Sequence, residues 1–104
     1  MAEIISNRYG YRSRKRSVTK TANYTLTTAD AVVLCDTSGG AFAITLMPAS
    51  EVTDREFDIK NLGANLLTIT PDGSDEIDEE PSLELGIQYT CVTVHSDGTN
   101  WWII

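Results

Sequence analysis

The chain has 104 residues, 41% of them hydrophobic, and a formal net charge of −7. This length suits a single domain with a modest core. No apolar run approaches the ~20 residues that a membrane-spanning helix needs, and the N-terminal stretch "MAEIISNRYGYRSRKRS" lacks the apolar block of a secretory signal. We therefore expect a protein without membrane association or export signal.

Charge divides the chain into two parts. Residues 1–20 hold six of the eight basic residues and one acid, which gives +5. Residues 21–104 hold two basic residues and fourteen acids, which gives −12. Residues 1–16 also lack hydrophobic periodicity, so we predict an extended basic arm over 1–20 and a folded domain over 21–104.

The arm combines positive charge with aromatic rings. Its candidate partner-binding residues are Arg8, Tyr9, Tyr11, Arg12, Arg14, Lys15 and Arg16. Such a segment is able to neutralise phosphates and stack on bases, or to make forked bonds to carboxylates on a protein. An unengaged tail is the third reading. Because the acidic domain repels a polyanion, we favour a protein partner over nucleic acid.

Short runs rich in Thr, Val, Ile and aromatic residues recur at roughly ten-residue intervals and predict strands. The turn segments between them include "DTSGG", "NLGAN", "PDGSD" and "SDGTN". Helical periodicity is weak throughout. We therefore predict an all-β fold, a small antiparallel β-sandwich or barrel-like domain. The candidate strands are Ser17–Lys20, Ala31–Asp36, Ala41–Met47, Glu56–Asn61, Asn65–Thr70, Ser82–Leu85, Gln88–His95 and Asn100–Ile104.

An acidic stretch, "PDGSDEIDEEPSLE", separates two of these strands. Its spacing does not match an EF-hand loop, so a solvated acidic loop is favoured over a calcium site. Such a loop also offers a docking place for a basic arm. The residues of this predicted docking loop are Asp72, Asp75, Glu76, Asp78, Glu79 and Glu80.

No arrangement of residues suggests catalysis. The single histidine, His95, ends a strand beside Ser96 and Asp97, and neighbours in sequence rarely supply a nucleophile, base and orienting group. Cys35 and Cys91 lie in apolar runs and are expected to be buried thiols; a disulfide requires that their strands be neighbours. We predict no enzyme activity, no metal and no cofactor.

The segment "SDGTNWWII" closes the sequence with a strand that is apolar on both sides. Because side chains alternate between faces, Trp101 and Trp102 point in opposite directions. We expect one of them in the core and the other near a neighbouring chain, unless a second sheet covers both. The predicted oligomer interface comprises Trp101, Trp102 and Ile104.

Three short sequence motifs, which we call marks, follow one another over residues 21–104: "DTSGG" before "ITL-P-A", "IKNLGAN" before "TI-PDGS", and the closing "SDGTNWW-I". This series resembles a β module of tailed-bacteriophage virion proteins, found in head-decoration proteins, head fibres and tail-fibre adhesins. The resemblance implies an antiparallel, frequently trimeric structural or adhesive module without catalytic residues. The acidic stretch and the doubled tryptophan depart from the commoner form.

The resemblance and the shortness of the chain together favour a capsid decoration or cement protein on the virion surface. We expect a homotrimer that binds the major capsid protein, or another virion protein, and stabilises the shell through non-covalent contacts of the arm. The alternative is a head- or tail-fibre adhesin module that stacks an exposed tryptophan on a host glycan. A carbohydrate-active β module is the third and least favoured reading.

Overall fold

A computed structural model describes residues 15–104. The predicted arm residues Arg8, Tyr9, Tyr11, Arg12 and Arg14 lie outside the described residues. Of the segment assigned to the arm, Lys15 and Arg16 lead directly into the first strand, Ser17–Lys20. We call Lys15 and Arg16, where the predicted arm joins the acidic domain, the root of the arm.

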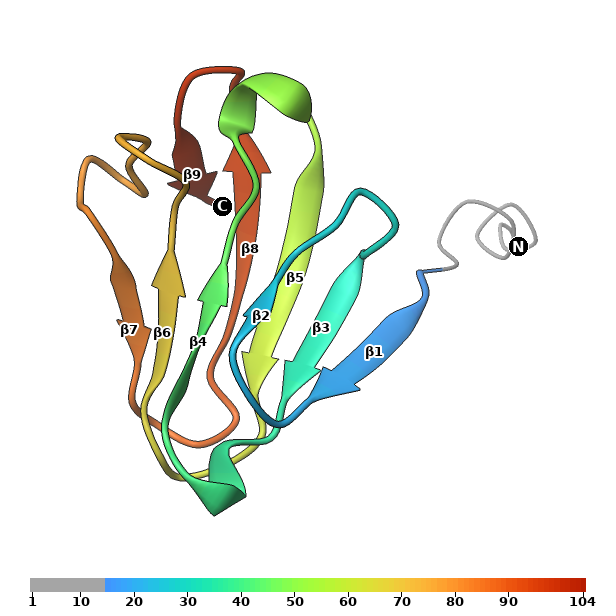
Figure 1. Cartoon of the computed structure of the whole chain (residues 1–104), viewed down its shortest axis with the longest axis vertical. Helices are drawn as coiled ribbons and strands as arrows, with labels where there is room; N and C mark the ends of the chain where they lie inside the picture. Colours follow the sequence, from blue (N-terminus) through green and yellow to red (C-terminus); the bar gives the residue numbers. More distant parts are fainter. Residues whose placement is uncertain (1–14) are drawn as a thin grey trace, which may run out of the picture.

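Within residues 15–104, nine strands form two sheets that pack face to face (Figure 1). The five-stranded sheet has the order β1-β3-β5-β8-β9, and the four-stranded sheet has the order β2-β4-β6-β7. Single-turn 3₁₀ helices follow β3 and β4, at Thr37–Gly39 and Ala49–Glu51. The strands are β1 Ser17–Lys20, β2 Tyr24–Thr25, β3 Val32–Cys35, β4 Phe42–Thr45, β5 Glu56–Asn61, β6 Leu67–Thr70, β7 Leu83–Leu85, β8 Cys91–Ser96 and β9 Trp101–Ile103.

The all-β prediction is confirmed, and the two sheets remain separate instead of closing into a barrel. The prediction of an antiparallel fold is wrong for much of the molecule. Strands β1, β3 and β5 run parallel, as do β2, β4 and β6; only β5–β8, β8–β9 and β6–β7 are antiparallel.

The parallel pairing follows from the path of the chain. From β1 to β6 every connection crosses to the opposite sheet, so the chain winds around the core as three successive coils. Within each sheet, the strand of one coil therefore runs in the same direction as the strand of the previous coil. Alternating hydrophobicity predicts which side of a strand is buried, but it carries no information on strand direction.

The core lies between the sheets and is built from the alternate residues that the sequence indicates. Ile44, Phe57, Ile59, Leu67 and Ile69 have no exposed surface. On β5, Phe57 and Ile59 alternate with the outward-facing Glu56, Asp58 and Lys60. A polar cluster closes one end of this core: the buried Asn61 accepts from Thr37 and donates to the carbonyl oxygen of Leu85.

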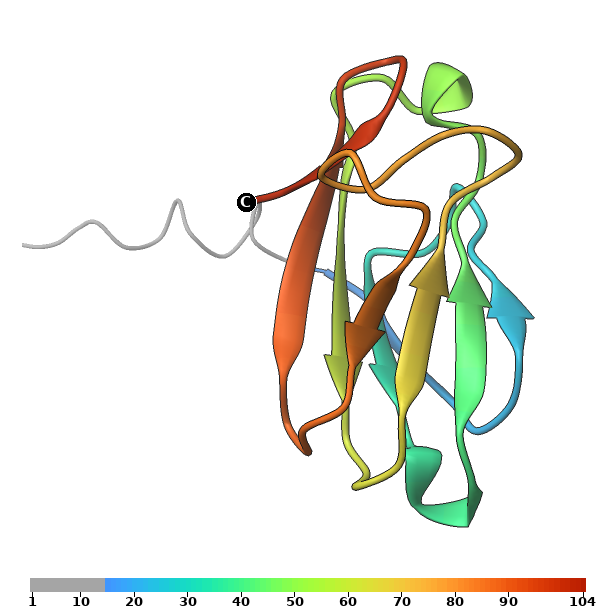
Figure 2. The same cartoon turned by 90° about the vertical axis from the view of Figure 1, so that its left-hand side faces the viewer.

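Hydrogen bonds among the β4–β5, β6–β7 and β8–β9 loops close the opposite end of the core. The hydroxyl of Ser96 donates to the carbonyl oxygen of Ala49 at 2.7 Å, and the carboxylate of Asp75 accepts from the N–H of Ala49 at 3.0 Å. The side-chain oxygen of Asn100 accepts from the N–H of Glu76. The loop between β6 and β7 thus reaches across to β9 (Figure 2). No helix within residues 15–104 is long and apolar enough to cross a membrane.

Candidate functional site: the outer face of the five-stranded sheet

The outer face of the five-stranded sheet mixes apolar and acidic side chains. Register places Val32 and Asp58 in one row with Thr93, and Glu56 in another row with His95 and Trp102. Val32 and Trp102 are half-buried, and Ile104 is 66% exposed. Lys60 and Cys91 occupy the next row, beyond Asp58. The face therefore offers apolar surface with carboxylates beside it.

The root of the arm lies on this face. The ammonium of Lys15 is 3.1 Å from a carboxylate oxygen of Asp58, whose other oxygen accepts a 2.6 Å bond from the hydroxyl of Thr93. Lys15 precedes β1, at one edge of the sheet, while Asp58 is two strands farther in. The chain therefore enters the fold from the outer side of the five-stranded sheet.

Part of the predicted docking loop lies against the other edge of the same sheet. Ile77 bridges to Trp101 in parallel, and the carboxylate of Asp78 accepts from the N–H of Ile103 at 2.9 Å. Asp78 and Glu79 form a tight turn with positive φ angles of 50° and 67°. This turn brings exposed carboxylates beside β9, so two predicted sets, the acidic loop and the last strand, meet in space.

The six loop residues do not share one role. Asp75 and Asp78 bind backbone N–H groups of neighbouring segments and so hold the loop in place. The others are exposed at the surface: Asp72, Glu76, Glu79 and Glu80. Within residues 15–104, His, Cys, Asp and Glu side chains form no group of three arranged to hold a metal ion.

The two tryptophans occupy opposite sides of the sheet. Trp101 has no exposed surface and packs on Phe57 with ring centroids 6.0 Å apart; it is therefore unavailable to a partner. Trp102 faces outward, and its indole N–H donates to Asp97 at 2.7 Å. Of the predicted interface residues, Trp102 and Ile104 remain at the surface.

The environment of Asp97 is strongly polar. Its carboxylate accepts hydrogen bonds from the backbone N–H groups of Asn100 and Thr99 and from the Trp102 indole. The Asn100 contact contributes most to lowering the pKa of Asp97 to about 2. Asp97 therefore stays negatively charged well below neutral pH and fixes the edge of the Trp102 ring.

His95 contacts carboxylates, whereas the two cysteines lie on opposite faces of the five-stranded sheet. His95 faces outward, with Nδ1 3.2 Å from Glu56 and Nε2 3.9 Å from Asp54. Cys35 is buried as expected, but Cys91 is exposed, which corrects the expectation that both thiols are buried. Their strands are separated by β5 and the thiols lie on opposite faces, so the pair cannot form a disulfide.

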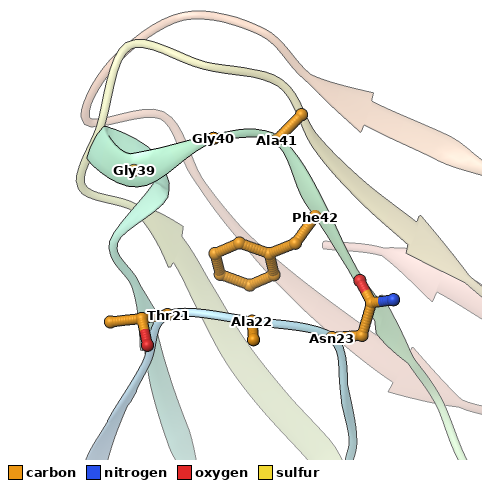
Figure 3. Close-up of a pocket in the computed structure, with 7 residues that line it drawn as sticks. All are labelled: Thr21, Ala22, Asn23, Gly39, Gly40, Ala41 and Phe42. Carbon is orange, nitrogen blue, oxygen red and sulfur yellow. The ribbon is translucent and has the colours of Figure 1, made fainter.

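A separate hollow that the sequence did not predict lies at the end of the domain near the "DTSGG" turn. It has a volume of about 300 Å³ and is open to solvent. Figure 3 shows the Phe42 ring between the Thr21–Asn23 segment and the Gly39–Ala41 segment. A side-chain carbon added at Gly39 or Gly40 would meet no atom within 4 Å.

The chain was compared with protein-family models, curated proteins and solved structures, and none of the three comparisons found a match. The resemblance to phage virion modules therefore stays a prediction from sequence.

Proposed function

We propose that this chain is a structural protein of a tailed-phage virion, a capsid decoration protein that binds the outer shell without catalysis. The observation that carries the proposal is the position of the arm root. A basic segment joins an acidic domain at Lys15, on a face that combines apolar side chains with carboxylates. This arrangement suits attachment through protein contacts, with the arm on neighbouring subunits and the domain as a rigid body.

The charge division favours protein over nucleic acid as the partner. Residues 15–104 contain five basic and fourteen acidic residues, a net charge of −9. Such a domain repels the phosphates of a nucleic acid, whereas it attracts arginines that belong to another protein. The major capsid protein and further copies of this chain, as a homotrimer, are the partners that we propose.

Deletion of residues 1–14 tests the attachment role, because it leaves β1 and the Lys15–Asp58 pair in place. We expect the truncated chain to fold but to lose affinity for the shell, and decorated particles to lose their added resistance to heat. A second variant exchanges Arg8, Arg12 and Arg14 for Gln in the full-length chain, so that only the positive charges of the arm are removed, and it should also lose affinity. Unchanged shell binding by both variants would contradict the proposal.

Glycan binding is the second candidate function, and the hollow at Phe42 supports it. The half-buried Phe42 ring lies beside the Thr21 hydroxyl, and a sugar ring can stack on such a ring while it hydrogen-bonds to a hydroxyl. Trp102 suits this role less well, because its indole N–H already donates to Asp97. The test is a glycan screen with Phe42→Leu as the comparison variant; binding that requires the Phe42 ring would favour an adhesin.

A further inference from the structure

We infer that the β9 edge of the outer face binds residues 8–14 of a second copy of this chain. The inference deepens the proposed function by naming where the arm binds, and it rests on that function for the arm's role in attachment. We call this surface the arm seat. It consists of Trp102, Ile104, Asp78, Glu79 and Asp97.

The arm seat has an apolar centre between two acidic sides. Trp102 and the 66% exposed Ile104 supply the apolar surface. The Asp78–Glu79 turn lies along the free edge of β9, where Asp78 accepts from the N–H of Ile103. On the other side, Asp97 is held beside the Trp102 ring by the indole hydrogen bond. The carboxylates cannot move far from the apolar centre, because hydrogen bonds to β9 hold two of them.

Residues 8–14, "RYGYRSR", match this surface in chemistry. Arginine makes forked, charge-assisted bonds to carboxylates, and its planar guanidinium also stacks on an indole face. Tyrosine covers apolar surface while its hydroxyl remains hydrated. In this segment Arg8 and Arg12 flank Tyr9 and Tyr11, so basic and aromatic groups are available within five residues.

The position of the arm root favours a second copy over the same chain. The root lies at β1 and the seat at β9, on opposite edges of the sheet. At ~4.8 Å per strand, about 19 Å separates them. A fully extended chain spans at most ~3.6 Å per residue, so the three residues from Lys15 to Arg12 cover only about 11 Å of this distance, which favours an arm from another copy.

An arm that leaves at one edge and a seat at the other edge produce a head-to-tail contact. Contacts of this kind close into rings when the rotation between copies permits it. Each copy then donates one arm and accepts one arm. This geometry is compatible with the homotrimer that the proposed function includes.

A charge exchange in the full-length chain tests the contact by sedimentation equilibrium. We expect Arg12→Glu and Glu79→Lys each to weaken self-association by about fivefold or more, and the double variant to recover most of the loss. Glu84→Lys is the matched control, because Glu84 is exposed on β7 of the other sheet. A chain that stays monomeric, or one in which Glu79→Lys behaves like Glu84→Lys, would overturn the inference.

A crosslinking experiment identifies the occupant of the seat directly. Cys91 is exposed on β8, the strand next to β9, whereas Cys35 is buried. A photoreactive maleimide on Cys91 of an isotopically heavy copy, mixed with light copies, should capture residues 1–14 of light chains. Capture only within one copy, or of another segment, would overturn the inference. Ser82→Cys in a Cys91→Ser chain carries the probe to the other sheet as a control.

The two proposals fail in different ways. The self-association and crosslinking measurements use the isolated protein, so their outcome does not depend on a shell. If the copies exchange arms but do not bind shells, the decoration function fails and the arm seat stands. If shells bind in an arm-dependent manner while the copies never associate, the arm seat fails and the decoration function stands.

Discussion

The hydroxyl of Thr37 donates to the side-chain oxygen of Asn61 at 2.8 Å, across 24 positions of the chain. Asn61 in turn donates to the carbonyl oxygens of Asn65 and Leu85, and accepts from the N–H of Gly63. The contact joins the "DTSGG" turn to the "NLGAN" turn. Two of the marks that suggested a phage module are therefore parts of one buried polar cluster, and their role is to hold the fold together.

Gly63→Ala should destabilise the protein at this cluster. An added Cβ would lie 2.5 Å from the Thr37 hydroxyl oxygen and 2.6 Å from the backbone nitrogen of Ser38. We expect a loss of about 1–3 kcal/mol in the free energy of unfolding, measured by urea denaturation. Gly39→Ala is the matched control, since its Cβ meets no atom within 4 Å. Equal effects at the two glycines would contradict the packing described here.

Trp101 should tolerate phenylalanine far better than alanine. Its ring is fully buried against Phe57, but its indole N–H has no hydrogen-bond partner within the described residues. Trp101→Ala should cost about 3–5 kcal/mol of stability. Trp101→Phe should cost less than half as much, because it keeps an aromatic ring and removes an unpaired polar group. If Trp102→Ala proved as damaging as Trp101→Ala, the assignment of faces would be wrong.

The two thiols should react with a disulfide reagent in two separate phases. Burial raises the pKa of Cys35 to about 12, so about one thiol in ten thousand is ionised at pH 8. Cys91 is exposed. The folded protein should release one equivalent of product quickly and a second only on unfolding. Cys91→Ser should abolish the fast phase; a fast phase that survives this change would place Cys35 at the surface.

The contribution of Asp97 to stability should disappear in acid. Its pKa in the folded protein, about 2, lies below the ~3.9 of an unfolded aspartate, so its contribution is present above pH ~4 and is lost as the pH falls through 2. The difference in free energy of unfolding between the native chain and Asp97→Asn should become smaller as the pH is lowered from about 4 to 2. Asp72→Asn is the control, because Asp72 is an exposed aspartate on another loop. A difference that does not change with pH would contradict the assignment.

Local patterns in the sequence predict which side of several strands is buried, but they do not predict the two-residue strand β2, Tyr24–Thr25. The alternation of Phe57 and Ile59 with Glu56, Asp58 and Lys60 predicts the two faces of β5 as they are found. Strand direction depends on where a connection leads, which is a long-range property. The turn after β3 looks like a hairpin turn, yet it carries the chain into the other sheet.

The candidate site was predictable only as separate pieces. Composition pointed to the acidic loop, and alternation pointed to an outward tryptophan. Their meeting depends on the bridge between Ile77 and Trp101, which are 24 positions apart and carry no pairing signal in the sequence. The exposure of Cys91 was not predicted, because Val92 and Val94 suggest an apolar run. The outward-facing Thr93, two residues later, indicates the side on which Cys91 lies.

The parallel ladder between β1 and β3 also determines how the domain responds to a pull. Ser17 to Lys20 pair in register with Val32 to Cys35, and the chain leaves this ladder at its N-terminal end. Tension at Lys15 along the strand axis would load all the hydrogen bonds of this ladder together. These hydrogen bonds would have to break together, whereas hydrogen bonds pulled perpendicular to the strand break one after another. Resistance to such a pull would therefore be greatest along the direction of β1.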